Sequence, residues 1–160
     1  MRSAHDLVAM GPCAIITGML VQYRMATEAQ REVVARLVSV CAEAALPGWV
    51  SELLVRYVPE GSVHAQVYAE YEYRRVRIEL GASFFASDGV GQARDFVHEL
   101  SHALQAPLVA FMDAVASGTG LFKGRQGAIF EGLYTTAMEA ANEDVAEAIW
   151  KGLDKPGMVW

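Results

Sequence analysis

Apolar side chains recur every three or four residues in several stretches of the chain, which is the spacing of one face of an α-helix. Thr27 and Gln30 form a capping box at the start of the first stretch, and the Pro47-Gly48 pair ends it. Pro107 interrupts a later stretch and is expected to end or kink the helix there. The predicted helices run from Thr27 to the first break and then over residues 92–105, 108–116 and 128–150.

Between the first two helices, apolar and polar residues alternate with a period of two, which is typical of half-buried β-strands. Three strands are predicted, over Leu53–Val58, Val63–Tyr71 and Val76–Leu80. The order along the chain is therefore helix, small sheet, helix, helix. This order predicts an α+β fold with an N-terminal helix, a three-stranded sheet and a long C-terminal helix.

The length and composition of the chain predict a single domain. With 160 residues, 53% of them hydrophobic, the chain has enough apolar mass for one core and too little length for two ordinary domains. The apolar run Leu7–Val21 is too short to span a bilayer, and Asp6 before it makes it a poor secretory signal. We expect residues 1–25 to be a poorly ordered N-terminal extension and residues 26–153 to form the domain.

Charge and cysteine content narrow the class of protein further. The formal net charge is −6, so the chain has no summed positive field to attract a phosphate backbone. Cys13 and Cys41 lie far apart and match neither a disulfide framework nor a cysteine zinc site. We therefore expect a cytoplasmic protein that binds neither nucleic acid nor a membrane.

Residues 98–102, HELSH, match the H-E-x-x-H motif of zinc hydrolases. On a helix, His98 and His102 project from one face one turn apart, so that two ring nitrogens can bind one tetrahedral Zn²⁺. Glu99 is offset by about 100° around the helix, where its carboxylate can reach a water at the metal without binding the metal itself. The motif predicts two metal ligands, His98 and His102, and one catalytic acid/base, Glu99.

A third metal ligand must come from elsewhere in the chain. Gln105 and Leu108 stand where the metzincin pattern would continue, so that class is excluded. The last predicted helix offers four carboxylates, three of which share one stripe at four-residue spacing. These candidates are Glu131, Glu139, Glu143 and Glu147.

The pattern of the last helix leaves open whether these acids face solvent or another helix. The opposite side is apolar, which favours a solvated acidic stripe. That apolar side consists of Phe130, Leu133, Ala137, Met138, Ala141, Val145 and Ile149. However, Thr136, Ala140, Ala146 and Trp150 share the acidic side, where small groups would let another helix approach closely.

The chain resembles the small zincin-like metallopeptidases encoded by bacteriophages and prophages. The resemblance covers roughly Leu53 to Ile149, and the HELSH helix is its specific part. The other features are an alternating strand with a tyrosine near its end, an Ile-x-Leu strand, a Phe-Phe pair and a final helix that carries Glu. They correspond here to Tyr71 or Tyr73, to Ile78 and Leu80, and to Phe84-Phe85.

The resemblance implies a minimal zincin-like fold in which His98 and His102 bind the metal and Glu99 acts as acid/base. A closing pattern of Glu, a small residue and an apolar residue matches Glu143, Ala146 and Ile149, so the resemblance implies Glu143 as the third ligand. The implied function is a Zn²⁺-dependent peptidase that acts on a peptide or protein substrate. The alternative is a catalytically inactive zincin-like accessory or structural protein of a phage that keeps the metal site.

The chain departs from the commonest form of this family at Ser101, where a bulky apolar residue often stands, and at Asn142-Glu143-Asp144. The resemblance also implies that the Val76–Leu80 strand is the edge strand beside the cleft, where an extended peptide can pair with it. Arg75 and Arg77 on that strand would then favour acidic substrates or simply be solvated.

Asp95 and Tyr134 are two further candidates, and two isolated histidines are not. Asp95 could orient the free ring nitrogen of His98 or stabilise the first turn of its helix. Tyr134 could stabilise the oxyanion of the transition state or pack as an ordinary helix tyrosine. His5 and His64 stand apart from the motif and are interpreted as histidines without a metal.

Overall fold

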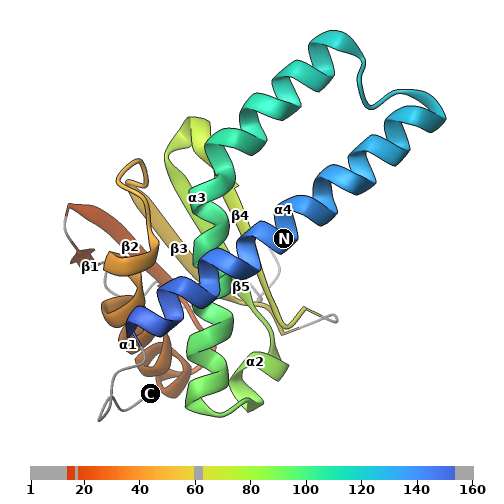
Figure 1. The fold of residues 1–160 in the computed structure, drawn as a ribbon. Helices are drawn as coiled ribbons and strands as arrows, with labels where there is room; N and C mark the ends of the chain where they lie inside the picture. Colours follow the sequence, from red (N-terminus) through yellow and green to blue (C-terminus); the bar gives the residue numbers. More distant parts are fainter. Residues whose placement is uncertain (1–13, 17, 60–62, 154–160) are drawn as a thin grey trace, which may run out of the picture.

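A computed structural model describes residues 14–16, 18–59 and 63–153, which form an α+β fold. A mixed sheet makes one layer, and helices cover one of its faces (Figure 1). The strands are β1 (Ala14–Ile16), β2 (Met19–Arg24), β3 (Glu52–Tyr57), β4 (Ala65–Glu70) and β5 (Arg75–Leu80), in the spatial order β1-β2-β3-β5-β4. The inner strands β2, β3 and β5 are parallel, whereas β1 and β4 run antiparallel to their neighbours.

The helices are α1 (Glu28–Ala45), α2 (Ala82–Ala86), α3 (Gly89–Thr119) and α4 (Gly124–Leu153). A short 3-10 helix, η1 (Tyr71–Tyr73), joins β4 to β5. The predicted capping box of α1 is confirmed: Thr27 Oγ1 accepts a hydrogen bond from the Gln30 N–H, and Gln30 Oε1 accepts one from the Thr27 N–H, both at 3.2 Å.

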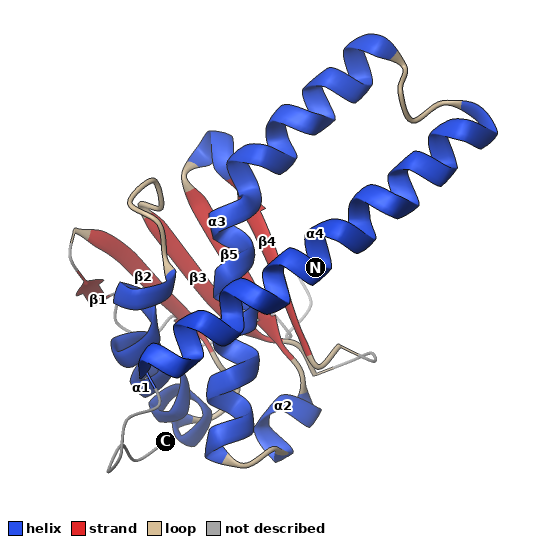
Figure 2. Cartoon of the chain, in the orientation of Figure 1, coloured by secondary structure: helices blue, strands red, loops and turns tan. Residues whose placement is uncertain are grey.

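The core lies between the sheet and the helices (Figure 2). Alternate residues of the inner strands point into it, because side chains of a strand alternate between the two faces of a sheet. The fully buried strand residues are Val21, Leu53, Val55, Val76, Ile78 and Leu80. Phe96, Val97 and Leu100 of α3 meet them, so the helix that carries the HELSH motif is anchored by its apolar side.

The sheet has five strands in the described part of the chain, so the prediction of three strands was wrong. The two additional strands, β1 and β2, lie in the segment 1–25 that was expected to precede the domain. β2 pairs with β3, and its Val21 is fully buried, so this part of the segment belongs to the fold. Residues 1–13 and 17, which include His5 and Cys13, lie outside the described residues.

The expectation that Val76–Leu80 is the edge strand was also wrong. β5 lies inside the sheet, between β3 and β4, and the strand at the edge beside α3 is β4. The alternation of apolar residues identifies a strand but carries no information about its neighbours, because pairing order depends on the path of the whole chain.

Helix α3 continues past Pro107, so the prediction that this residue ends the helix was wrong. Figure 1 shows that the helix bends between its first half, which lies on the sheet, and its second half. Proline has no N–H to donate to the carbonyl four residues earlier, which here belongs to Ala103. The structure fills this gap from another element, since the indole N–H of Trp49 donates a hydrogen bond to the Ala103 carbonyl at 3.2 Å. A tertiary contact therefore replaces the hydrogen bond that the helix lacks.

The second half of α3 and the first half of α4 project from the sheet as a two-helix arm (Figure 1). Several large apolar residues on this arm are exposed, including Phe111 at 62% and Leu133 at 67%. Among the described residues, no helix combines the length and the hydropathy needed to cross a membrane.

Candidate metal centre

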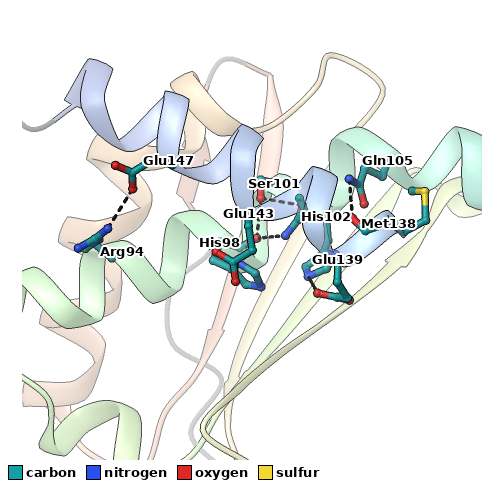
Figure 3. Close-up of polar contacts among 10 residues, drawn as sticks. Arg94, His98, Ser101, His102, Gln105, Met138, Glu139, Glu143 and Glu147 are labelled. Carbon is teal, nitrogen blue, oxygen red and sulfur yellow. Dashed lines mark hydrogen bonds and ion pairs between the residues drawn. The ribbon is translucent and has the colours of Figure 1, made fainter. Parts of the chain in front are cut away.

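The HELSH residues lie in the first half of α3, where the helix is packed against the sheet. His98 and His102 are both half-buried, and their ring centroids lie 5.0 Å apart at an interplanar angle of 87°. One helical turn separates them, as the motif predicts. Figure 3 shows that both rings face side chains from α4, which crosses α3 at this point.

The structure decides which side of α4 packs on α3. The buried residues of α4 in this region are Asn142, Ala146 and Trp150, which lie on the side that also carries the acids. The more apolar side is less buried, since Val145 and Ile149 are half-buried and Leu133, on the projecting half of α4, is exposed. The small side chain at 146 allows close approach of the helices, and this approach brings the carboxylates of α4 to the histidines of α3.

Ser101 of α3 and Asn142, the first residue of the Asn142-Glu143-Asp144 run of α4, are partners of each other. Both are fully buried. The Ser101 hydroxyl lies 2.8 Å from Asn142 Oδ1 and 2.7 Å from the carbonyl oxygen of His98, so its one proton has two acceptors. The Asn142 side-chain amide donates to the same His98 carbonyl at 3.2 Å. This network fixes the register of α4 against the turn of α3 that carries His98 and His102.

The carboxylates of α4 occupy different positions around the two histidines. Glu139 Oε2 lies 3.8 Å from His102 Nε2, and Glu143 Oε1 lies 3.8 Å from His98 Nδ1. His98, His102 and Glu139 each offer one potential ligand atom, and these three atoms lie within 4.8 Å of one another. In the described part of the chain, this is the group of side chains that could hold a metal ion. Glu147 is paired with Arg94 at 2.9 Å. The structure thus gathers Glu139 with the histidines, whereas the resemblance had implied Glu143.

Glu131, the remaining candidate for the third ligand, is exposed on the arm and does not belong to this group. Glu143 lies outside it as well. Its side chain is 73% exposed and lines a smaller hollow of about 250 Å³ beside Arg94 and Trp150. It approaches His98 at Nδ1, which is where an outer carboxylate would orient the ring of a metal ligand.

A cleft of about 850 Å³ opens at the histidines. His98, Glu99, His102 and Glu139 line it together, and β4 forms the facing wall. A volume of this size is within the range of about 300–1,000 Å³ that is typical of ligand pockets. The group that can hold a metal therefore lies in a hollow large enough for a substrate.

Burial raises the pKa of the Glu99 carboxyl to about 6, while the neighbouring His98 opposes this shift. A hydrogen bond from the backbone of Val67 also opposes it by favouring the charged carboxylate. Because β4 is the edge strand, the Val67 N–H is free to point at Glu99 rather than at another strand. A carboxylate with a pKa near neutrality suits proton transfer at neutral pH.

The side chains present fit a zinc ion. Burial lowers the pKa of His102 below its ordinary value, with Glu139 opposing the shift, which favours the neutral imidazole whose nitrogen can offer a lone pair. Tetrahedral Zn²⁺ with bonds of about 2.0–2.1 Å holds its ligand atoms about 3.3–3.4 Å apart. The 3.8 Å contact between His102 and Glu139 is close to this, and the Glu139 side chain, 56% exposed, is free to adjust.

The other candidate residues lie elsewhere. Asp95 Oδ2 lies 2.7 Å from Nε2 of His64 and so pairs with that ring, and Nδ1 of His64 lies 3.0 Å from the Ser83 hydroxyl. This contact ties the start of β4 to α2 and α3. Tyr134 packs near Phe122 on the arm and does not line the cleft, so it is not placed to stabilise an oxyanion there.

Arg75 and Arg77 do not line the cleft either. Arg75 pairs with Glu52 at 2.8 Å, and Arg77 lies over the ring of Tyr68 at 4.3 Å. The suggestion that they favour acidic substrates therefore has no support in the structure.

Two contributors to the site were missed at the level of sequence. Val67 acts through its backbone N–H, which leaves no signature in the side-chain pattern. Asn142 did leave a signal. It is a polar residue on the same side of its helix as Ala146, and the HELSH helix carries a serine among its apolar positions. Two such polar residues on two packed helices indicate a polar contact between them. Comparisons of the chain with protein-family models, with curated proteins and with solved structures find no match.

Proposed function

We propose that this protein is a Zn²⁺-dependent peptidase with a zincin-like site, in which His98, His102 and Glu139 bind the metal. The observation that carries the proposal is the convergence of these three side chains, from two helices, in a cleft that also contains Glu99. A hydrolytic zinc site needs a carboxylate that lies beside the metal without binding it, and Glu99 has this position. A structural zinc site is closed by four protein ligands and needs no such carboxylate.

Each residue has a separate task in this proposal. Zinc bound at the three ligands would supply a Lewis acid that polarises a peptide carbonyl and acidifies water. Glu99 takes the proton from the attacking water and passes it to the leaving amine. Glu143 holds the ring of His98 from its Nδ1 side, and the Ser101–Asn142 network keeps α4 in register.

The free edge of β4 is the proposed docking strand for substrate. Ala65, Val67 and Ala69 line the cleft from this strand. An extended peptide can add to such an edge by main-chain hydrogen bonds, which places its carbonyl groups between the strand and the active helix.

The experiment that tests the function separates metal binding from chemistry. Zinc content is measured by elemental analysis and peptide cleavage by mass spectrometry, for the wild type and for Glu99→Gln, His98→Ala and His102→Ala. We expect about one zinc per chain in the wild type and in Glu99→Gln, little in the histidine variants, and cleavage in the wild type alone. Asp144→Asn, an exposed change on α4 outside the cleft, serves as the control.

Two results would contradict the proposal in different ways. Unchanged zinc content in both histidine variants would remove the metal site altogether. Zinc-loaded wild type that cleaves no peptide in a diverse pool, or Glu99→Gln that cleaves as fast as the wild type, would remove the assigned chemistry and leave a metal-holding protein without this activity.

A further inference from the structure

The two-helix arm, residues 104–138, carries most of the large apolar side chains that the described part of the chain exposes. Seven of these eleven exposed residues lie on the arm. Only four of its 35 residues are charged, which is about half the share of 20% in the whole chain. A concentration of exposed apolar side chains on one projecting element is typical of an interaction surface.

On α3, the exposed apolar residues form one stripe. Leu104, Leu108 and Phe111 follow one another at intervals of four and three residues, which is the heptad spacing of a contact between helices. Asp113 lines the cleft, whereas none of these three residues does. At about 100° per residue, the three lie roughly 140–180° around the helix from Asp113. The stripe therefore faces away from the cleft.

On α4, Phe130 and Leu133 lie on the same side of the arm as this stripe. Glu139 of α4 lines the cleft, whereas neither of these two residues does. At about 100° per residue, Phe130 lies roughly 180° and Leu133 roughly 120° around α4 from Glu139. Both helices thus turn apolar side chains to the side of the arm that lies opposite the cleft.

The two stripes also lie at the same level along the arm. The Gln105 side-chain amide donates a hydrogen bond to the Met138 carbonyl at 3.1 Å, which places these two residues opposite each other. Because α3 and α4 run in opposite directions, Phe111 is level with Gly132, the residue before Leu133 (Figure 1). We call the combined surface the apolar face; it consists of Leu104, Leu108, Phe111, Phe130 and Leu133.

The area of the apolar face matches what a stable dimer needs. Its residues are between 38% and 67% exposed. With about 150–200 Å² for each fully exposed side chain, they leave roughly 400–500 Å² of apolar surface in water. A standard interface buries about 800 Å² per partner, of which about 57–65% is apolar. The apolar face therefore supplies the apolar part of one such interface.

The polar residues of the arm favour a protein partner over a bilayer. Asp113 on α3 and Glu131 on α4 lie near the middle of the arm, and insertion of the arm into a membrane would take both carboxylates into hydrocarbon. Two helices with one shared apolar face can instead pack on a second such pair and form a four-helix bundle. A twofold axis lets the same face meet itself, so a second copy of this chain is a complementary partner.

The charges along the arm select an antiparallel arrangement of the two copies. Lys123 and Arg125, the basic residues of the arm, lie at its tip, whereas Asp113, Glu131 and Glu139 lie further towards the sheet. Parallel arms would bring the basic tips of both copies together. Antiparallel arms separate the tips and place each one beside the acidic end of the partner's arm, which is the complementary arrangement.

We propose that two copies of this chain associate through the apolar face into an antiparallel, twofold dimer in which the arms form a four-helix bundle. The face lies opposite the cleft, so both clefts stay open in the dimer. The dimer depends neither on zinc nor on the proposed peptidase function, and either can fail without the other.

The first test is sedimentation velocity of the full chain, without zinc, at several concentrations up to about 100 μM. We expect the wild type to sediment as two chains, and Phe111→Ser/Leu133→Ser to dissociate with a constant at least about 100-fold higher, because both residues lie in the centre of the contact. Leu20→Ser/Val90→Ser, which replaces two exposed apolar residues outside the arm, should dimerise like the wild type. Circular dichroism checks that each variant is folded.

The second test addresses the orientation of the arms. In an antiparallel dimer, Lys123→Glu/Arg125→Glu brings acidic tips beside the acidic end of the partner's arm, so we expect roughly tenfold weaker association at low salt and a smaller effect at high salt. In a parallel dimer, the reversed charges would repel each other as the basic ones did. Unchanged association of this variant would therefore overturn the antiparallel arrangement.

Three further results would overturn the dimer itself. A wild type that stays monomeric at about 100 μM has no such contact. Phe111→Ser/Leu133→Ser that associates as tightly as the wild type would place the contact elsewhere, and assemblies that keep growing with concentration would indicate an open, head-to-tail contact. A monomeric wild type that floats with phosphatidylcholine vesicles, when Phe111→Ser/Leu133→Ser does not, would assign the apolar face to a membrane instead.

Discussion

Glu139 and Glu143 differ by one helical turn and approach different nitrogens of different histidines. Glu139 approaches His102 at Nε2 inside the cleft, and Glu143 approaches His98 at Nδ1 from the neighbouring hollow. The first position suits a metal ligand, and the second suits a group that orients a ligand through its other ring nitrogen. Two acids with the same place in the sequence pattern therefore occupy different positions, and the proposed function gives them different roles.

The difference predicts unequal losses of zinc affinity. Glu139→Gln should weaken zinc binding by more than about 100-fold, because a ligand is lost, and Glu143→Gln by about tenfold, the lower end for an outer carboxylate. Competition with a chromophoric chelator measures both constants, with Asp144→Asn as the control. A larger loss in Glu143→Gln than in Glu139→Gln would reverse the assignment.

At the same scale, Ser101 and Asn142 show how one polar residue in a helix contact requires another. A buried polar group left without its partner costs about 1–3 kcal/mol, while replacing both partners by apolar groups can be nearly neutral. We expect Ser101→Ala alone to lower the free energy of unfolding by this amount, because Asn142 Oδ1 loses its donor, and Ser101→Ala/Asn142→Leu to recover most of the loss. Urea denaturation followed by circular dichroism measures both, and a double variant that is less stable than either single one would be the contrary result.

At the scale of elements, α3 combines a core helix with an arm, and Pro107 lies between the two parts. The helix stays continuous because Trp49 supplies the hydrogen bond that the proline cannot. The local sequence alone therefore favours a break that the tertiary contact prevents.

This compensation predicts that Trp49 and Pro107 are energetically coupled. Trp49→Phe should destabilise the protein by about 1–3 kcal/mol, because it leaves the Ala103 carbonyl without a donor. In a Pro107→Ala background the cost should be smaller, since the alanine N–H bonds to that carbonyl. Unfolding free energies of the four proteins form a double-mutant cycle, and equal costs of Trp49→Phe in both backgrounds would contradict this explanation.

At the scale of the whole molecule, the proposed metal joins two helices that are packed through few buried residues of α4. Binding that occurs only in the folded state stabilises it, by about 2.7 kcal/mol at a free zinc concentration of 100 times the dissociation constant. For a chain of this size we expect the Tm to rise by roughly 5–10 °C on adding zinc to the metal-free protein.

Scanning calorimetry measures this rise, and Glu139→Gln provides the control. The variant keeps the packing of α4 but should show little zinc-dependent stabilisation. An equal rise of Tm in the variant would mean that zinc binds at another place in the chain, and no rise in the wild type would mean that no such link between α3 and α4 exists.

The sequence by itself determined those features that depend on neighbours within a turn or two of the chain. The position of His98, Glu99 and His102 on one helix follows from helical periodicity, as do the capping box at Thr27 and the limits of α1. The α+β class also follows from the order of period-two and helical patterns. These are local properties, because their geometry is fixed by the backbone of one element.

Only the tertiary structure decided how the elements are put together. Which strand forms the edge, how α3 passes Pro107 and which acid reaches the histidines all depend on contacts between distant segments. For α4, periodicity offered an apolar side and an acidic side. The side that packs on α3 is the one with Asn142, Ala146 and Trp150, because Ala146 permits close approach and Asn142 finds a partner in Ser101; the acids stand at the border of this contact.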